Sequence, residues 1–74
     1  MSEQPKSGDE IRITATKGYG SFRVGDVLIV AHSWIINSCD SPIVFVRALM
    51  KGRKSLSILK GHYFEWEIIN RFNQ

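Results

Sequence analysis

The sequence has 74 residues, enough for one small domain, and a chain of this length buries only about 60% of its unfolded surface. Its 43% hydrophobic and 23% charged residues are typical of a globular domain and not of a disordered or membrane chain. The longest apolar runs, 27–31 and 43–46, are far shorter than the roughly 20 residues of a spanning helix. No apolar segment follows the first charges, as a signal peptide would require. We therefore expect no membrane association and a cytoplasmic location.

The net charge of +3 is unevenly distributed. Residues 1–40 contain four basic and five acidic side chains, whereas residues 41–74 contain six basic and two acidic ones. An anionic partner would be attracted to the second half of the chain. Cys39 is the only cysteine, so no intramolecular disulfide can stabilise the domain.

The first seven residues are polar, and we expect them to form a flexible tail before a domain that spans residues 8–74. Strict alternation of apolar and polar residues from Asp9 to Thr16 predicts a half-buried strand. Residues 17–21 contain two glycines and predict a loop.

The same Gly-Asp step precedes the first two predicted strands, at Gly8-Asp9 and at Gly25-Asp26. The second strand, from Val27 to about Ser33, is apolar on both faces, which is typical of a central or covered strand. Turn-forming residues at 37–42 predict a loop, and β-branched and aromatic residues at 43–50 predict a third strand.

A glycine-containing turn at 51–54 and the alternation that follows it predict a hairpin between the third strand and a fourth. We expect a short helical turn at His62-Tyr63 and then a closing strand, because apolar and acidic residues alternate from Phe64 to Ile68. Five short strands predict an all-β fold, and curling the sheet into a small barrel would remove its exposed edges.

The segment Gly8-Asp9-Glu10-Ile11-Arg12-Ile13 resembles the first strand of SH3-like barrels, and residues 17–22 resemble their long first loop. Val24-Gly25-Asp26 is similar to the turn into their second strand. The Gly-Asp opening and Lys17-Gly18 are also similar to the KOW-type branch, whose members bind RNA, DNA or nucleic-acid machinery. This resemblance, which covers roughly residues 8–70, implies a single small five-stranded SH3-like barrel with a short helical turn before the last strand.

A cluster of basic residues is the most informative candidate site. No acidic residue interrupts the chain between Asp40 and Glu65. Five basic residues lie in this interval: Arg47, Lys51, Arg53, Lys54 and Lys60. A phosphate backbone would relieve their mutual repulsion and release counterions on binding. The alternative is a solvated hairpin tip that only improves solubility.

Aromatic residues near these charges strengthen the nucleic-acid hypothesis. Tyr19 lies between two glycines in the first loop, close to Lys17, and Tyr63 follows Lys60 closely. Exposed rings beside cations are the combination that single-strand binders use. We assign the other aromatic residues of this region, Phe22 and Phe45, to the core.

A protein interface is the second kind of site that the sequence predicts. Trp34 adjoins a polar loop, and together with Tyr63 it is a candidate anchor for a protein partner. Trp66 lies on an alternating apolar face and is assigned to the core. Because the second and third strands are apolar on both faces, we expect an outer hydrophobic patch that would suit a partner protein or a homodimer. The expected patch consists of Leu28, Val30, Ile43 and Leu49.

No residue set predicts an enzyme, a cofactor or a metal site. Cys39, His32 and His62 are scattered and lack the closely spaced pairs of a structural zinc site. Glu65 and Glu67 have no evident acid–base partner.

Two hypotheses follow for a non-enzymatic binding module. In the first, the chain binds nucleic acid, or docks on transcription, replication or translation machinery, through the basic hairpin and the glycine-rich loop. In the second, it is a small regulatory protein, of the kind found in phages and mobile elements, that binds a partner protein through the apolar patch. The sequence leaves open the partner, the oligomeric state and the choice between DNA and RNA.

Overall fold

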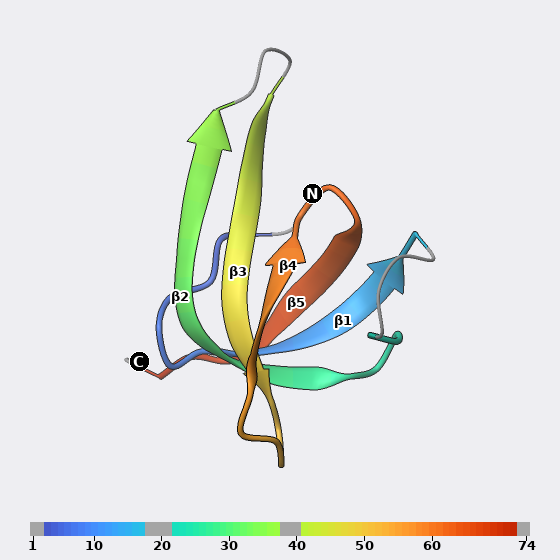
Figure 1. Ribbon diagram of the computed structural model, residues 1–74, viewed down its shortest axis with the longest axis vertical. Coiled ribbons are helices and arrows are strands. Elements are labelled where there is room, and N and C mark those ends of the chain that lie inside the picture. Colours follow the sequence, from blue (N-terminus) through green and yellow to red (C-terminus); the bar gives the residue numbers. More distant parts are fainter. Residues whose placement is uncertain (1–2, 18–21, 38–40, 73–74) are drawn as a thin grey trace.

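The computed structural model describes residues 3–17, 22–37 and 41–72. These contain five strands: β1 Glu10–Thr16, β2 Val27–Asn37, β3 Pro42–Met50, β4 Leu56–Lys60 and β5 Phe64–Asn70. The strands form one antiparallel sheet in the order β4-β3-β2-β1-β5 (Figure 1). The predicted all-β fold with five strands is confirmed. The described ranges contain no helix with the length and apolar character needed to cross a membrane.

Strand β2 connects the two halves of the sheet. Its residues 27–29 pair with β1, and its residues 28–37 pair with β3. The register shifts between Val30 and His32, which marks a bulge in β2. The strand passes along β1 and then bends upward beside β3 (Figure 1).

This bend folds the sheet onto a single core. The core contains residues from all five strands, and the predicted burial of Trp66 is confirmed. Its buried members are Ile11, Ile13, Leu28, Val30, Val46, Ala48, Leu59, Phe64 and Trp66.

The helical turn predicted at His62-Tyr63 is wrong. Residues 61–63 form a tight turn between β4 and β5, in which the Tyr63 N–H donates to the Lys60 carbonyl at 3.0 Å. The Gly61 N–H donates instead to the Val44 carbonyl at 2.7 Å. Because β5 begins at Phe64, residues 61–63 all serve to reverse the chain between β4 and β5.

The two Gly-Asp steps form the same turn. In residues 6–9 and 23–26, the N–H of the aspartate donates to the carbonyl three residues earlier, at 3.0 and 3.1 Å. In each turn the aspartate carboxylate accepts the N–H of the first residue at 2.9 Å. Gly8 and Gly25 have φ of 91° and 98°, the left-handed conformation that a type II turn requires at its third position. The repeated Gly-Asp dipeptide therefore forms the same turn immediately before two strands, β1 and β2.

The Asp9 carboxylate also connects the two ends of the described chain. It is buried and accepts the Lys6 N–H at 2.9 Å and the Phe72 N–H at 3.1 Å. The hydrogen bond from Lys6, supported by that from Phe72 and by the charges of Arg71 and Lys6, lowers the pKa of Asp9 although burial opposes this.

Residues 3–7, for which we expect a flexible tail, contact the body of the domain. Pro5 is fully buried, and its carbonyl accepts a hydrogen bond from the Ser33 hydroxyl. The Glu3 carbonyl accepts the Trp66 Nε1–H at 2.8 Å, and the Glu3 carboxylate pairs with Arg71 at 2.9 Å. These are not the contacts of a free tail.

The two equivalent glycines allow a matched test of the turn. Gly25→Ala adds only the backbone strain of the left-handed conformation, about 1–2 kcal/mol, because no atom lies within 4 Å of the new Cβ. In Gly8→Ala the new Cβ would also lie 2.7 Å from Phe72 Cγ and 2.8 Å from Phe72 Cβ. We expect urea denaturation to show a larger loss of stability for Gly8→Ala, and Phe72→Gly, which removes both of these atoms, to eliminate the excess. Equal losses in the two single variants would contradict this account.

Stability should depend on pH through Asp9. Because folding lowers the pKa of this carboxyl, its contribution is complete above about pH 4 and is lost as the pH falls through the lowered folded pKa. We expect Asp9→Asn to lower the free energy of unfolding by about 1–3 kcal/mol at neutral pH. The difference in this free energy between the variant and the native chain should become smaller below about pH 4. Asp26→Asn, in the more exposed equivalent turn, is the control and should cost less. Urea titrations across this pH range measure both, and a gap that does not change with pH would refute the assignment.

Candidate binding surface

The side chains of β2, β3 and β4 that point away from the core form a continuous surface, which we call the outer face. Its residues alternate along each strand with the buried residues of the core. The cross-strand rows are Ile29–Leu49–Leu56, His32–Arg47–Ile58 and Trp34–Phe45–Lys60, followed by Ile36–Ile43 beyond the end of β4.

Three stacked rings lie in the upper part of the outer face. The His32 and Trp34 rings are 5.5 Å apart with planes at 24°, and the Trp34 and Phe45 rings are 5.6 Å apart at 12°. Phe45 is half-buried on this face, so its assignment to the core is wrong. The alternation of β3 gives the inward positions to Val46 and Ala48. Phe22, by contrast, packs against the core with its ring edge-on to Phe64.

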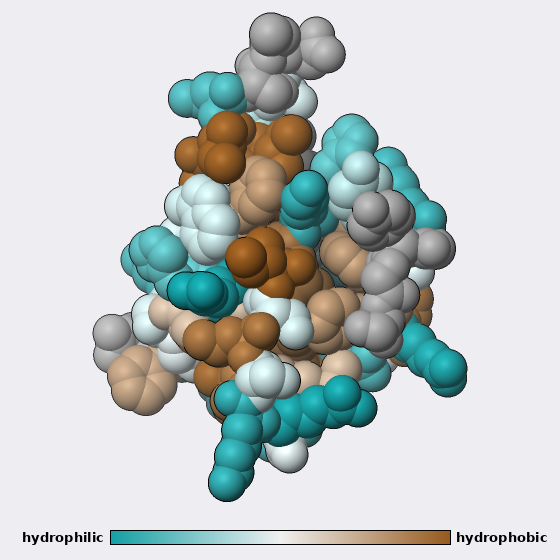
Figure 2. All heavy atoms as spheres, in the orientation of Figure 1, coloured by the Kyte–Doolittle hydropathy of each residue, from teal (hydrophilic) through white to brown (hydrophobic). Residues whose placement is uncertain are grey.

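Large aliphatic side chains surround the rings. Ile36, Leu56 and Ile58 are each about half exposed, at 49%, 49% and 52%. Figure 2 shows hydrophobic side chains over the upper ends of β2 and β3 and again lower on the same face. An apolar patch is thus present, with Ile43 and Leu49 among its members as expected.

The predicted patch is wrong for Leu28 and Val30, which are fully buried. Both faces of this part of β2 are apolar, so the alternation did not indicate which set points inward. The pairing with β1 and β3 directs Leu28 and Val30 to the core and Ile29 to the outer face.

The outer face is positively charged. It contains Arg47 and Lys60, and neither makes an ion pair within the described part of the chain. The Lys60 ammonium lies 6.0 Å from the centre of the Tyr63 ring. At the margin of the face, Glu10 is 3.9 Å from Lys51. None of the residues in the outer-face rows is acidic.

The predicted basic site is divided between the two ends of β4. Lys51, Arg53 and Lys54 lie in the turn before this strand, and Lys60 is its last residue. The five residues of β4 span roughly 16 Å.

Lys17 belongs to the Lys60 end, because its N–H donates to the Tyr63 carbonyl at 3.1 Å. Arg47 lies between the ends, on the outer face. Phe22 and Arg53 line one hollow of about 110 Å³. Tyr19 lies outside the described residues.

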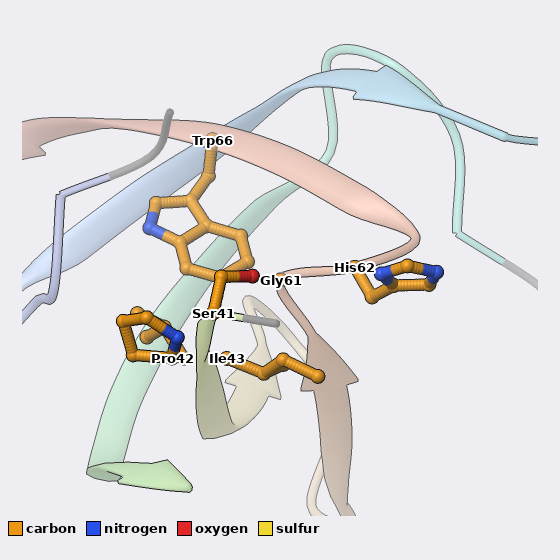
Figure 3. Close-up of a pocket in the computed structure, with 7 residues that line it drawn as sticks. Ser41, Pro42, Ile43, Gly61, His62 and Trp66 are labelled. Atoms are coloured by element: carbon orange, nitrogen blue, oxygen red, sulfur yellow. The ribbon is translucent and has the colours of Figure 1, made fainter. Parts of the chain in front are cut away.

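A second hollow adjoins the outer face, and sequence reasoning missed it. It has a volume of about 180 Å³ and is lined by residues 41–44, Gly61, His62 and Trp66. The Trp66 indole points toward Ser41 and Gly61 (Figure 3). The hollow lies between two segments that are twenty residues apart in the sequence. Gly61 is the one residue whose type could have indicated this close approach, because a Cβ there would lie 2.9 Å from the Val44 carbonyl oxygen.

The remaining candidates within the described ranges lie apart from one another or in other contacts. Among the described residues, no three His, Cys, Asp or Glu side chains are grouped as a metal site would require. His32 belongs to the ring stack, and His62 lies edge-on to Tyr63 at 5.1 Å. Cys39 is outside the described residues. Glu67 is paired with Arg12.

Comparison with known proteins found no matching family model, no matching curated protein and no matching solved structure. The function is therefore inferred from the geometry of the outer face and of the hollow beside it.

Proposed function

We propose that this protein is a non-enzymatic docking module whose outer face binds a partner protein. The observation that carries the proposal is that β2 and β3 are apolar on both faces. Inner side chains such as Leu28 and Val46 fill the core, whereas outer ones such as Ile36 remain about half exposed. Strands with two apolar faces are usually covered on both sides. A contiguous exposed apolar surface typically marks an interface.

The arrangement of residues on the outer face supports this function. Trp34 and Arg47, the residue types that dominate interface hot spots, occupy neighbouring rows on β2 and β3. Aliphatic residues surround them, and Lys60 and Tyr63 lie toward the edge. Because no acidic residue stands in the outer-face rows, a partner with acidic residues at its rim would be complementary.

The fold itself we propose to be an SH3-like barrel. The five antiparallel strands, the glycine turn before β2 and the long connection between β1 and β2 support this assignment.

Nucleic-acid binding is the second candidate function, and unpaired cations favour it. Within the described residues, Lys17, Arg47, Arg53, Lys54 and Lys60 make no ion pair. They lie at both ends of β4 and beside it. A single strand of DNA or RNA lying along β4 would meet phosphate-binding groups at both ends of β4 and the stacked rings beside it.

An affinity capture experiment tests the docking function. The tagged protein is incubated with a lysate of its source cells after nuclease treatment and at high salt. We expect one stoichiometric partner, reduced at least tenfold with Ile58→Asp, because this change puts a charge into the outer face. Ile69→Asp on β5 is the matched control, since Ile69 is also exposed, at 43%, but lies off the outer face. Equal retention by the two variants would reject the outer face as the site. If the partner is a second copy, Ile58→Asp abolishes dimerisation in sedimentation.

Titration with short labelled DNA and RNA strands tests the second function. We expect binding at low salt that weakens steeply with salt concentration, since counterions are released. Replacing Arg53 and Lys54 by Ala should reduce the salt slope by about 1 for each phosphate interaction that the substitutions remove. Arg12→Ala removes a cation already paired with Glu67 and should change little. An absence of binding at low salt, or unchanged slopes in the double variant, would exclude this function.

A further inference from the structure

Strand β3 extends beyond its neighbour β4. Pairing between β2 and β3 continues to Asn37 and Pro42. Pairing between β3 and β4 ends at Phe45 and Lys60, after which the chain turns away at Gly61. Residues 42 and 43 are therefore paired on the β2 side alone, and on its other side Val44 is bonded only through its carbonyl, to the Gly61 N–H, which leaves a short free sheet edge at residues 42–44.

The backbone groups at this edge are a donor and an acceptor. The Val44 carbonyl accepts the Gly61 N–H, so residue 44 directs its backbone groups to the β4 side of the strand. In an antiparallel ladder, the N–H and C=O of one residue point to the same neighbour, and alternate residues share that direction. The Val44 N–H and the Pro42 C=O therefore face the free edge. Pro42 has no N–H, so no second donor is left there.

The 180 Å³ hollow lies along this same edge. Ile43 and the Trp66 indole supply apolar walls, and His62 and Ser41 add polar groups. Figure 3 shows Pro42 and Ile43 on one side of the hollow, with Trp66 and Gly61 across from them. A strand added at a sheet edge obtains its affinity from backbone hydrogen bonds and its specificity from pockets for alternate side chains.

We propose that an extended segment of the partner protein adds to β3 at residues 42–44 and inserts one apolar side chain into the hollow. This inference rests on the proposed docking function and names the form of the partner that it recognises. Lys60, which is opposite Phe45 and makes no ion pair in the described chain, selects an acidic residue next to the apolar one.

A second copy of this chain is a poorer occupant of the edge. Two β3 strands could satisfy each other's Val44 N–H and Pro42 C=O only if they paired antiparallel about Ile43. That register would put Ser41 of one copy opposite Phe45 of the other, and Lys60 already occupies this position. A separate peptide avoids the conflict because it can leave the edge at Gly61.

The test uses random linear peptides displayed on phage and selected on the immobilised protein. The most enriched peptide is then added to isotope-labelled protein. We expect slower amide exchange at Val44 and chemical-shift changes at Gly61 and the Trp66 indole. The enriched sequences should share an apolar residue beside an acidic one.

Two variants separate edge pairing from other modes of binding. Val44→Pro removes the edge donor, and His62→Trp narrows the hollow while leaving the backbone intact. Each variant should weaken the affinity for the peptide about tenfold, which corresponds to the loss of one good hydrogen bond or of one apolar side chain from its pocket. Val24→Pro, at the second position of the 23–26 turn where proline fits, should leave binding unchanged. Circular dichroism verifies that all three variants are folded.

The outcomes distinguish this inference from the docking function on which it rests. Shifts confined to His32, Trp34 and Ile58, or full binding by His62→Trp, would overturn the edge pairing and leave the outer face as the docking site. A library without any enriched sequence would also overturn it. The edge pairing would also be overturned if Ile58→Asp failed to capture the partner from the lysate while Val44→Pro still captured it.

Discussion

One buried carboxylate holds the two ends of the described chain together. Asp9 accepts backbone N–H groups from both ends of the described chain, at Lys6 and Phe72, while its own backbone carbonyl accepts the Val30 N–H at 2.8 Å. Burial of an unpaired charge would cost several kcal/mol, so the site is favourable only when both donors are in place. β1, the N-terminal segment and the end of β5 are therefore held together by one residue.

The bend in β2 connects the part of the sheet beside Asp9 to the candidate binding surface. The lower part of β2 pairs with β1, and its upper part forms a two-stranded arm with β3 that extends past β4. A two-stranded ribbon is marginally stable by itself. Here the core anchors its base, so the arm can present apolar residues on the outer face. The same extension creates the free edge at residues 42–44 and the hollow beside it.

The sequence predicted those features that depend on local patterns. Alternation located the first, fourth and fifth strands, and runs of apolar, β-branched and aromatic residues located the second and third. Gly25 and Gly52 indicated turns that indeed need positive φ. Alternation could not indicate which face of β2 points inward, because Leu28 and Ile29 are equally apolar. The basic cluster looked continuous because its members are close in sequence, although the two ends of β4 separate them. The contacts of residues 3–5 escaped detection since backbone carbonyls make several of them.

The Asp9 clamp also has a consequence for biosynthesis. The two backbone N–H groups that donate to the Asp9 carboxylate differ greatly in order of appearance, because Phe72 follows Asp9 by 63 residues. At ribosomal speeds of 5–20 residues per second, the second donor emerges roughly 3–13 s after the aspartate. During this interval β1 lacks β5, with which it pairs over most of its length. Until β5 is available, Ile11 and Ile13 lack the strand that helps to cover them in the folded domain.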